Sequence, residues 1–220
     1  MRRFFCFLIL ILLVVACSPT KPTEPSQRIS LGEERGRYTF DTPDTPWDVF
    51  SLGGDQALFR VQSGLLEGAV IADRGYIWSL SSTRHNDVAI SATVQQTKGS
   101  RGNGFGVMCR ANEQGDGYYF VVSSAGQFAI LKAQTGVSDP IRLVDWQSSP
   151  AIFQGDASNQ IEAVCAGDYL AFSANGTFLA DVCDSEFSSG ALGVVLGAIE
   201  ATLWVNFDDI IVREAAQLGG

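Results

Sequence analysis

Asp87-Val-Ala-Ile-Ser-Ala-Thr-Val-Gln-Gln96 is the stretch of this chain in which the periodicity of a β-strand is clearest. From Val88 to Val94 every second residue is apolar, and the residues between them are small or polar. Successive side chains of a strand point to opposite faces, so this spacing places one apolar set on a single face. The stretch therefore predicts a β-strand that packs one face against a hydrophobic core.

The same alternation recurs along most of the chain, between short segments rich in turn-forming residues. Asn175-Gly176 is the strongest of these turn signals, because both residues tolerate the positive φ angles of a two-residue hairpin. No window shows convincing helical spacing. We therefore predict an all-β protein, a two-sheet antiparallel β-sandwich of the jelly-roll type, with a three-stranded meander over 161–182. The expected strands are 57–62, 65–71, 76–80, 87–96, 105–111, 118–123, 127–133, 161–165, 169–173, 177–182, 191–196 and 201–212.

Length and charge limit the classes of protein that this chain can belong to. The patterned region, residues 38–214, fits a single β-sandwich domain, and residues 215–220 are expected to form a short tail. The chain carries 15 Lys and Arg residues against 24 Asp and Glu residues, a net charge of −9. Phosphate backbones are bound by basic stripes, and none is visible. We expect no nucleic-acid partner, and the sequence leaves the oligomeric state open.

The first 37 residues differ in composition from the rest. Arg2 and Arg3 precede a short apolar run that ends at Ala16, which is typical of a secretory signal and too short to span a membrane. Val14-Val-Ala-Cys17 also resembles the lipobox of bacterial lipoproteins, which implies a signal peptide over 1–16 and lipidation of Cys17. A plain secretory signal, with Cys17 unmodified, is the alternative. Residues 17–37, rich in Pro, Ser and Thr, would form a flexible tether for an exported domain anchored to the bacterial cell membrane or outer membrane.

Three cysteines follow the tether: Cys109, Cys165 and Cys183. An oxidising compartment allows one disulfide among them. The meander places one strand between Cys165 and Cys183, which separates their backbones by about 9 to 10 Å, more than a disulfide tolerates. We favour a Cys109–Cys165 disulfide and expect Cys183 to be a free, buried thiol. A nucleophilic role for Cys183 would require a basic partner, and the only histidine, His85, is distant in sequence.

Several motifs resemble the concanavalin A-like (LamG-like) lectin and glucanase jelly rolls: Gly104-Phe-Gly-Val-Met-Cys-Arg110, Gly117-Tyr-Tyr-Phe-Val-Val-Ser123, Glu162-Ala-Val-Cys-Ala-Gly-Asp-Tyr-Leu170 and Trp204-Val-Asn-Phe-Asp-Asp-Ile210. Within that group the chain is similar to bacterial extracellular domains described as 3-keto-disaccharide hydrolases. The resemblance covers about residues 38–214. In those relatives the two cysteines occur as a matched pair, which supports joining Cys109 to Cys165. Fold alone does not imply activity.

No arrangement of residues predicts a catalytic centre. Glucanases that share this resemblance carry Glu-x-Asp-x-x-Glu on one strand, and this chain has no such run. Asp181, Asp184 and Glu186 are the nearest candidates, but they straddle an expected strand end. The chain also lacks a nucleophile elbow, a phosphate-binding loop and the histidines of a zinc site. Catalysis is therefore not predicted, and a glycoside hydrolase-like enzyme acting on oligosaccharides remains the alternative.

The resemblance also suggests a structural calcium ion, because an Asp of the closing strand often helps to hold one in similar jelly rolls. Asp208 or Asp209 would take that role here. The oxygen-rich loop 112–117 lacks the alternating ligand positions of an EF-hand and is expected to be a hairpin loop. No other cofactor is expected.

Alternation suggests where a sugar-binding surface would lie. If Phe105 and Leu203 face the core, then the side chains at 110, 119, 204 and 206 face outward, and an aromatic surface with a few polar groups suits a pyranose. We expect a carbohydrate platform in which Trp78 is a rim residue, although a loop or the second sheet could simply cover Trp204 and Trp78. The predicted function is non-catalytic recognition of a carbohydrate or cell-surface polymer; an envelope protein-interaction module is a further alternative. The expected platform residues are Arg110, Tyr119, Trp204, Asn206 and Trp78.

Overall fold

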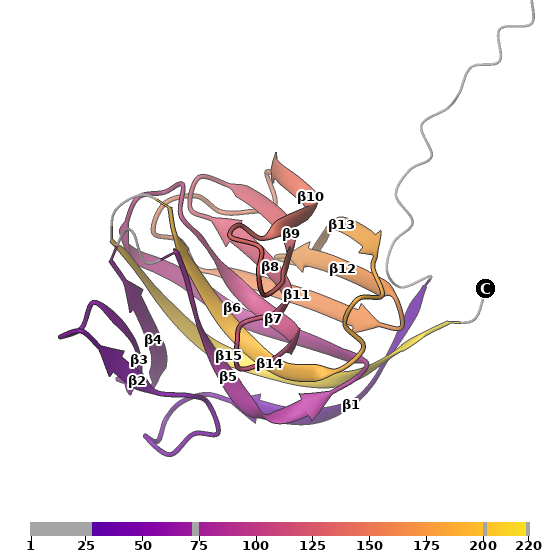
Figure 1. Ribbon diagram of the computed structural model, residues 1–220, viewed down its shortest axis with the longest axis horizontal. Helices are drawn as coiled ribbons and strands as arrows, with labels where there is room; N and C mark the ends of the chain where they lie inside the picture. The colour runs from indigo at the N-terminus through magenta and orange to yellow at the C-terminus, as the bar shows by residue number, and fades with distance from the viewer. Residues whose placement is uncertain (1–27, 72–74, 200–201, 219–220) are drawn as a thin grey trace, which may run out of the picture.

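The structure, a computed structural model, describes residues 28–71, 75–199 and 202–218, and within them every regular element is a β-strand. The strands form two antiparallel sheets packed face to face (Figure 1). Along the nine-stranded sheet lie β13 (Thr177–Cys183), β12 (Tyr169–Ala174), β11 (Asn159–Ala166), β6 (Val88–Gly99), β15 (Leu203–Gln217), β4 (Leu65–Val70), β3 (Ala57–Gln62) and β2 (Phe50–Leu52), and β1 (Ile29–Tyr38) also pairs with β15. Along the six-stranded sheet lie β10 (Ile141–Ser148), β9 (Gln127–Ala133), β8 (Gly117–Ser123), β7 (Gly104–Ala111), β14 (Gly190–Ala198) and β5 (Gly75–His85). Within the described ranges, no helix has the length and hydrophobicity needed to cross a membrane.

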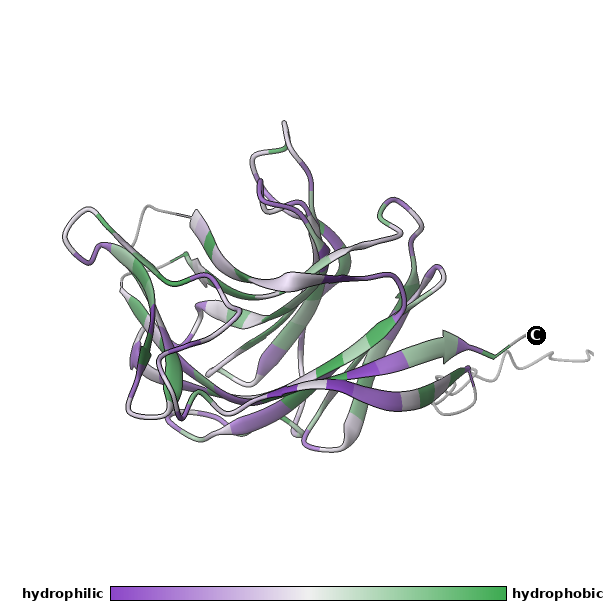
Figure 2. Cartoon of the chain, turned by 90° about the horizontal axis from the view of Figure 1, so that it is seen from below, coloured by the Kyte–Doolittle hydropathy of each residue, from purple (hydrophilic) through white to green (hydrophobic). Residues whose placement is uncertain are grey.

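The main core lies between the two sheets and follows from the period-two pattern. In β6, Val88, Ile90, Ala92 and Val94 belong to this core, as the alternation of 87–96 predicts. Figure 2 shows strands on which hydrophobic and hydrophilic segments alternate. The two-sheet antiparallel sandwich is confirmed, and so is the meander, since β11, β12 and β13 are consecutive in the sheet and turn at Asn175 and Gly176 with positive φ angles.

The structure differs from the sequence prediction at both ends of the domain. Residues 29–37, expected in the tether, form most of β1. Residues 215–217 of the expected tail belong to β15, where Gln217 lies opposite Ile29. The edge strands β2 and β10 were not expected either. A strand that is held mainly by its backbone hydrogen bonds needs no apolar alternation. The apolar pattern therefore did not reveal β1, β2 and β10. The predicted signal peptide and Cys17 lie outside the described residues.

The predicted disulfide joins the two sheets. Cys109 in β7 and Cys165 in β11 are bonded, with their Cα atoms 6.8 Å apart. Both residues lie in the main core, so the bond crosses the sandwich interior. Cys183 is a free cysteine, as predicted, but it is exposed instead of buried, because it lies at the end of β13, the edge strand of its sheet.

Candidate ligand-binding cavity

The five residues predicted to form one carbohydrate platform lie on two different sheets. Trp204 and Asn206 belong to β15 of the nine-stranded sheet, whereas Trp78, Arg110 and Tyr119 belong to the six-stranded sheet. The predicted alternation is confirmed at Phe105, Phe120 and Leu203, which face the core. Outward-facing residues of the two sheets therefore point away from each other, and the single platform is a wrong prediction. Alternation within a strand gives the face of a side chain but not the sheet to which the strand belongs.

Arg110 does not face solvent. Its side chain is 1% exposed, and its Nη2 donates to Asp87 Oδ1 at 3.0 Å. The guanidinium also donates to the carbonyl oxygens of Asn86 and Phe187, at 3.0 and 2.9 Å. The backbone of Arg110 is in the left-handed region, with φ 54°. This conformation breaks the alternation of side chains between the two faces of β7 at this residue. Arg110 therefore joins β7 to the loops before β6 and β14, and it is unavailable to a ligand.

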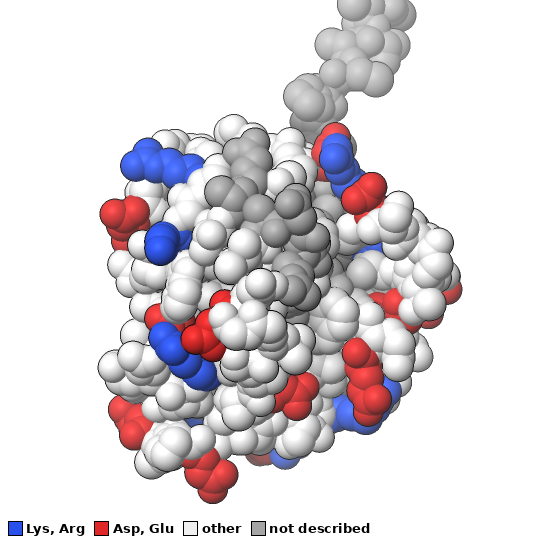
Figure 3. Space-filling model, turned by 60° about the vertical axis from the view of Figure 1, so that its left-hand side comes forward, with Lys and Arg blue, Asp and Glu red and all other residues white. Residues whose placement is uncertain are grey.

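Trp204 is half-buried on the outer face of the nine-stranded sheet. The Arg60 guanidinium lies over its ring, 5.7 Å from the centroid, and Arg60 Nε donates to Glu67 Oε1 at 2.7 Å. Asn206 lies two residues further along β15, and its buried Oδ1 has no hydrogen-bond partner among the described residues. An ion-paired arginine of β3, a strand of the same sheet, thus covers Trp204, whereas the alternative had expected a loop or the second sheet to do so. Figure 3 shows one face of the molecule, on which acidic and basic side chains are interspersed without a continuous basic stripe.

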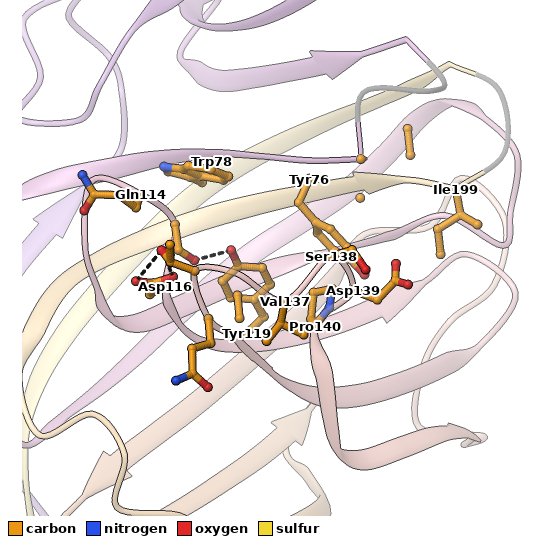
Figure 4. A pocket seen from close by; sticks show the side chains of 17 residues that line it. Tyr76, Trp78, Gln114, Asp116, Tyr119, Val137, Ser138, Asp139, Pro140 and Ile199 are labelled. Carbon is orange, nitrogen blue, oxygen red and sulfur yellow. Dashed lines mark hydrogen bonds between the residues drawn. The ribbon is translucent and has the colours of Figure 1, made fainter.

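A cavity of about 520 Å³ lies at the outer face of the six-stranded sheet. Its walls come from β5, the loop between β7 and β8, the segment between β9 and β10, and the end of β14. The aromatic side chains of Tyr76, Trp78 and Tyr119 line it together (Figure 4). Gln114, Thr135, Ser138 and Asp139 add polar groups, and Val137, Pro140 and Ile199 add apolar ones. The structure therefore brings together two of the five predicted residues, Trp78 and Tyr119.

The loop between β7 and β8 is held over the sheet by its own polar side chains. Asn112 Oδ1 accepts hydrogen bonds from the backbone N–H groups of Gln114 and Asp116, both at 3.0 Å. Asn112 Nδ2 donates to Asp116 Oδ2 at 2.8 Å, and Thr135 Oγ1 donates to Asp116 Oδ1 at 2.9 Å. Gly115 has φ +84°, and an added Cβ would lie 2.6 Å from the Trp78 ring. Only a glycine permits this close packing of loop against indole.

The two tyrosines of the cavity are fixed and uncharged. Their ring centroids are 5.7 Å apart, and the Tyr119 hydroxyl donates to the carbonyl oxygen of Gly115. Tyr119 is 2% exposed, and burial, reinforced by the nearby Tyr76 and Asp116, raises the pKa of its hydroxyl. Burial, followed by the effect of Asp139, also raises the pKa of Tyr76. Both side chains therefore remain neutral at physiological pH. Tyr76 is half-buried and presents part of its ring to the cavity, whereas Tyr119 lies almost fully buried at its floor.

One of the two carboxylates that line the cavity is held within its own loop. Asp116 accepts hydrogen bonds from Asn112 and Thr135, which use both of its oxygens. Figure 4 shows Asp139 at the other end of the cavity, with Tyr119 and Pro140 between them. A general acid and its partner carboxylate must flank one scissile bond. Asp116 therefore acts as a structural residue of the loop.

Asp184, one of the earlier catalytic candidates, also has a structural role. Asp184 accepts hydrogen bonds from Tyr118 and Lys132, both at 2.6 Å, and from the Glu186 N–H at 3.0 Å. Burial raises the pKa of Asp184, but the hydrogen bonds from Lys132, Tyr118 and the Glu186 backbone outweigh it and lower the pKa overall. Asp184 thus ties the loop before β14 to β8 and β9. It is held as an anion and is poorly suited to donate a proton.

The two carboxylates predicted to bind calcium lie at a bulge of β15. Asp209 has φ 46°, and its N–H donates to Asp208 Oδ1 at 2.7 Å. Burial raises the pKa of Asp208, the Asp209 N–H opposes this, and the neighbouring Asp209 and Asp41 raise it further. Within the described ranges, no group of three or more His, Cys, Asp or Glu side chains is placed to hold a metal ion. The calcium site stays a prediction.

Four further residues line the cavity but were not predicted from the sequence: Tyr76, Gln114, Thr135 and Asp139. Tyr76 and Trp78 are two residues apart in one strand, so alternation could have placed them on the same face. Nothing in the sequence indicated that the segment 134–140 lies beside the loop 112–116. That proximity depends on the order of β7, β8 and β9 in the sheet.

Several solved structures share this fold. Carbohydrate-binding module CBM66 from Bacillus subtilis is 16% identical, with a TM-score of 0.63 over 77% of this chain and 96% of the module. A Bacillus subtilis protein of unknown function with a galectin-like fold is 12% identical, with a TM-score of 0.63 over 85% of this chain and 98% of that protein. LamA from Z. galactanivorans, in complex with laminaritriose and laminaritetraose, is 8% identical, with a TM-score of 0.54 over 84% of this chain and all of that one.

The chain therefore has a concanavalin A-like jelly-roll fold. No protein-family model and no curated protein matches the sequence. At these identities the structural likeness establishes the fold alone.

Proposed function

We propose that the protein is a carbohydrate-recognition module that binds its ligand in the cavity of the six-stranded sheet. The observation that carries this proposal is the convergence of Tyr76, Trp78 and Tyr119 in one cavity with a polar rim. Aromatic rings pack against the apolar C–H face of a pyranose, and a few polar groups bind its hydroxyls. The names of two structural neighbours, a carbohydrate-binding module and a protein in complex with laminarin oligosaccharides, support this reading.

The hydrogen bonds of Asp116 and Asp184 favour binding without catalysis. Asp116 is engaged by the loop, and Asp184 is bonded to Lys132 and Tyr118. The second candidate, a glycoside hydrolase-like enzyme, would require a second carboxylate near Asp116 after rearrangement of the loop. If the protein hydrolysed a glycan that it binds, the result would favour the enzyme over the binding module.

The N-terminal sequence supports placing this module outside the cell. Under this proposal the chain is exported, is lipidated on Cys17 and is held at the bacterial cell membrane or outer membrane. The disulfide between Cys109 and Cys165 agrees with an oxidising compartment. Mass spectrometry of the mature protein tests this part, because an N-terminal peptide that starts at an unmodified residue would contradict it.

A glycan-array screen tests the carbohydrate proposal directly. The mature chain is screened with calcium and with a chelator, beside the Trp78→Ala variant and the Trp204→Ala variant. We expect specific glycans that the Trp78→Ala variant no longer binds and that the Trp204→Ala variant still binds. No specific glycan, or a signal lost equally in both variants, would refute the proposed site. Loss of binding or of thermal stability with the chelator would indicate the calcium ion.

A further inference from the structure

The outer edge of β5 is paired along only part of its length. β14 pairs with one edge of this strand from Gly75 to His85. On the other edge, the Asp48 N–H donates to Leu80 O and the Ser82 N–H donates to Pro46 O, both at 2.9 Å. These bonds flank an antiparallel bridge between Trp47 and Ser81. The chain itself therefore adds a short extra strand to this sheet, but only beside the middle of β5.

Beyond Asp48 the chain leaves this edge and enters β2 of the other sheet. Leu80 directs both backbone groups outward, since its N–H donates to Asp48 Oδ2 at 3.4 Å and its carbonyl accepts from Asp48. Backbone groups alternate in direction along an antiparallel strand, so those of Trp78 and Tyr76 also point outward. Among the described residues, β5 pairs as a strand only with β14, and Tyr76 and Trp78 make no backbone hydrogen bond outside the strand ladders.

A groove of about 420 Å³ lies beside this unpaired edge. Residues 48–50 and 52 form one wall, and Tyr76, Ile77 and Trp78 form the other. Val49 and Leu52 are 52% and 54% exposed, which is high for aliphatic side chains. Among the described residues that line this groove, Asp48 alone is charged. The groove thus combines unpaired backbone groups with apolar walls and one negative charge.

We propose that this groove binds an extended peptide segment of a partner protein, which adds a strand antiparallel to β5. The segment would continue the ladder that Pro46–Asp48 begins and would occupy the edge from which the chain departs at Val49. Strand addition supplies main-chain hydrogen bonds, and apolar walls accept alternate side chains. The antiparallel direction places the N-terminal end of the segment at Asp48. The segment therefore carries Lys or Arg at that end, followed by alternating apolar residues, and no Pro where it faces β5.

Other occupants fit the groove less well. An alkyl chain would bury the four backbone groups without giving them hydrogen-bond partners, which is unfavourable. A sugar would find few partners for its hydroxyls among Val49, Phe50, Leu52 and Ile77. A second copy of this chain would bring a whole sheet edge against the wall formed by residues 49–52, whereas a free strand fits between the two walls.

A phage-displayed library of linear heptapeptides tests the proposal with the full-length chain in a detergent without a sugar head group. The library is selected on wild type, and the enriched phage are counter-screened on Leu52→Lys and Ile141→Lys. Ile141 is a matched control, since it is an exposed aliphatic residue on β10, the opposite edge of the same sheet. We expect enriched peptides with alternating apolar residues whose affinity falls at least about tenfold on Leu52→Lys and stays unchanged on Ile141→Lys.

N-methylation of the synthetic peptide distinguishes strand addition from simple apolar contact. Methyl groups on the N–H groups that face β5 should lower affinity about tenfold or more, whereas methyl groups on alternate residues should have little effect. No enriched peptide, equal loss on both lysine variants, or an N-methylation pattern without alternation would overturn the proposal. A wild-type dimer in light scattering that Leu52→Lys abolishes would also overturn it, by assigning the groove to a second copy. Tyr76 and Trp78 line both the groove and the sugar cavity, but Leu52 and Ile141 do not line the cavity, so both lysine variants should keep the glycan binding of wild type on the array.

Discussion

The outer faces of the two sheets carry similar residue types but differ in what covers them. On the nine-stranded sheet, Arg60 lies over Trp204 and is ion-paired with Glu67. On the six-stranded sheet, Trp78 packs against the Gly115 loop and still lines an open cavity. An outward aromatic residue is therefore a weak indicator of a binding site by itself. The loops that surround it decide whether it meets a ligand.

Replacing one tryptophan on each face should produce the largest contrast. Trp78→Ala removes part of the aromatic wall of the cavity and should weaken glycan binding by about tenfold to a hundredfold. Trp204→Ala should leave the affinity within about twofold, because its ring lies on the opposite face. Isothermal titration with the glycan found on the array measures both. Equal losses in the two variants would remove the distinction between the faces.

The loop that closes the cavity can be displaced without altering an aromatic residue. Gly115→Ala places a Cβ 2.6 Å from the Trp78 ring and forces alanine to φ +84°, so we expect about tenfold weaker binding and about 1–3 kcal/mol less stability. Gly176→Ala is the matched control, since this turn glycine has φ +74° and open space around it. It should cost stability alone. Chemical denaturation and titration separate the two effects, and unaltered binding by Gly115→Ala would contradict the role of the loop.

The ion pair of Arg60 and Glu67, which lies over Trp204, should contribute little to the stability of the fold. Arg60 and Glu67 are partly exposed, and pairs of this kind contribute at most about 1 kcal/mol. Arg60→Ala should therefore lower the free energy of unfolding by about that amount or less and increase quenching of Trp204 by acrylamide. Glycan affinity should not change. If the Arg60→Ala variant bound a glycan at Trp204, then Arg60 alone would explain why wild type binds on one face and not on the other.

The smallest expected effect is that of pH on binding. Burial raises the pKa of both Tyr76 and Tyr119 above the ordinary value of 10, so the protonated form persists until strongly alkaline pH. Stability that depends on these neutral hydroxyls is fully present below about pH 10 and is lost only as the pH rises through the folded-state values. We expect less than about twofold change in affinity between pH 6 and 9. A marked fall by pH 9 would show that a group with a lower pKa controls the site.

The sequence predicted the interior of the fold better than its edges. Period-two alternation located β3, β6 and β9, because one face of each strand packs in the core. It missed β1, β2 and β10, whose positions depend on backbone pairing. It also missed the left-handed backbone at Arg110, which turns a residue expected at the surface into a buried one.

For the candidate site, the sequence predicted the face of a side chain but not the sheet to which it belongs. Alternation placed Tyr119 and Trp204 outward correctly, but both sheets have an outer face, and sheet membership depends on long-range pairing. Strand order within a local meander excluded a bond between Cys165 and Cys183. The resemblance to jelly rolls with a matched cysteine pair then favoured Cys109 with Cys165. Features set by neighbours in sequence were accessible, and those set by the order of distant strands were not.

The pairing of Ile29 with Gln217 brings both ends of the described body to one corner of the molecule. β15 extends from that corner to Leu203, four residues after the cavity residue Ile199, and its 15 residues span about 50 Å at about 3.3 Å each. A chain held by its N-terminus would consequently present the cavity at its distal end, facing away from the support. An affinity tag or surface linker at either terminus would leave that entrance unobstructed.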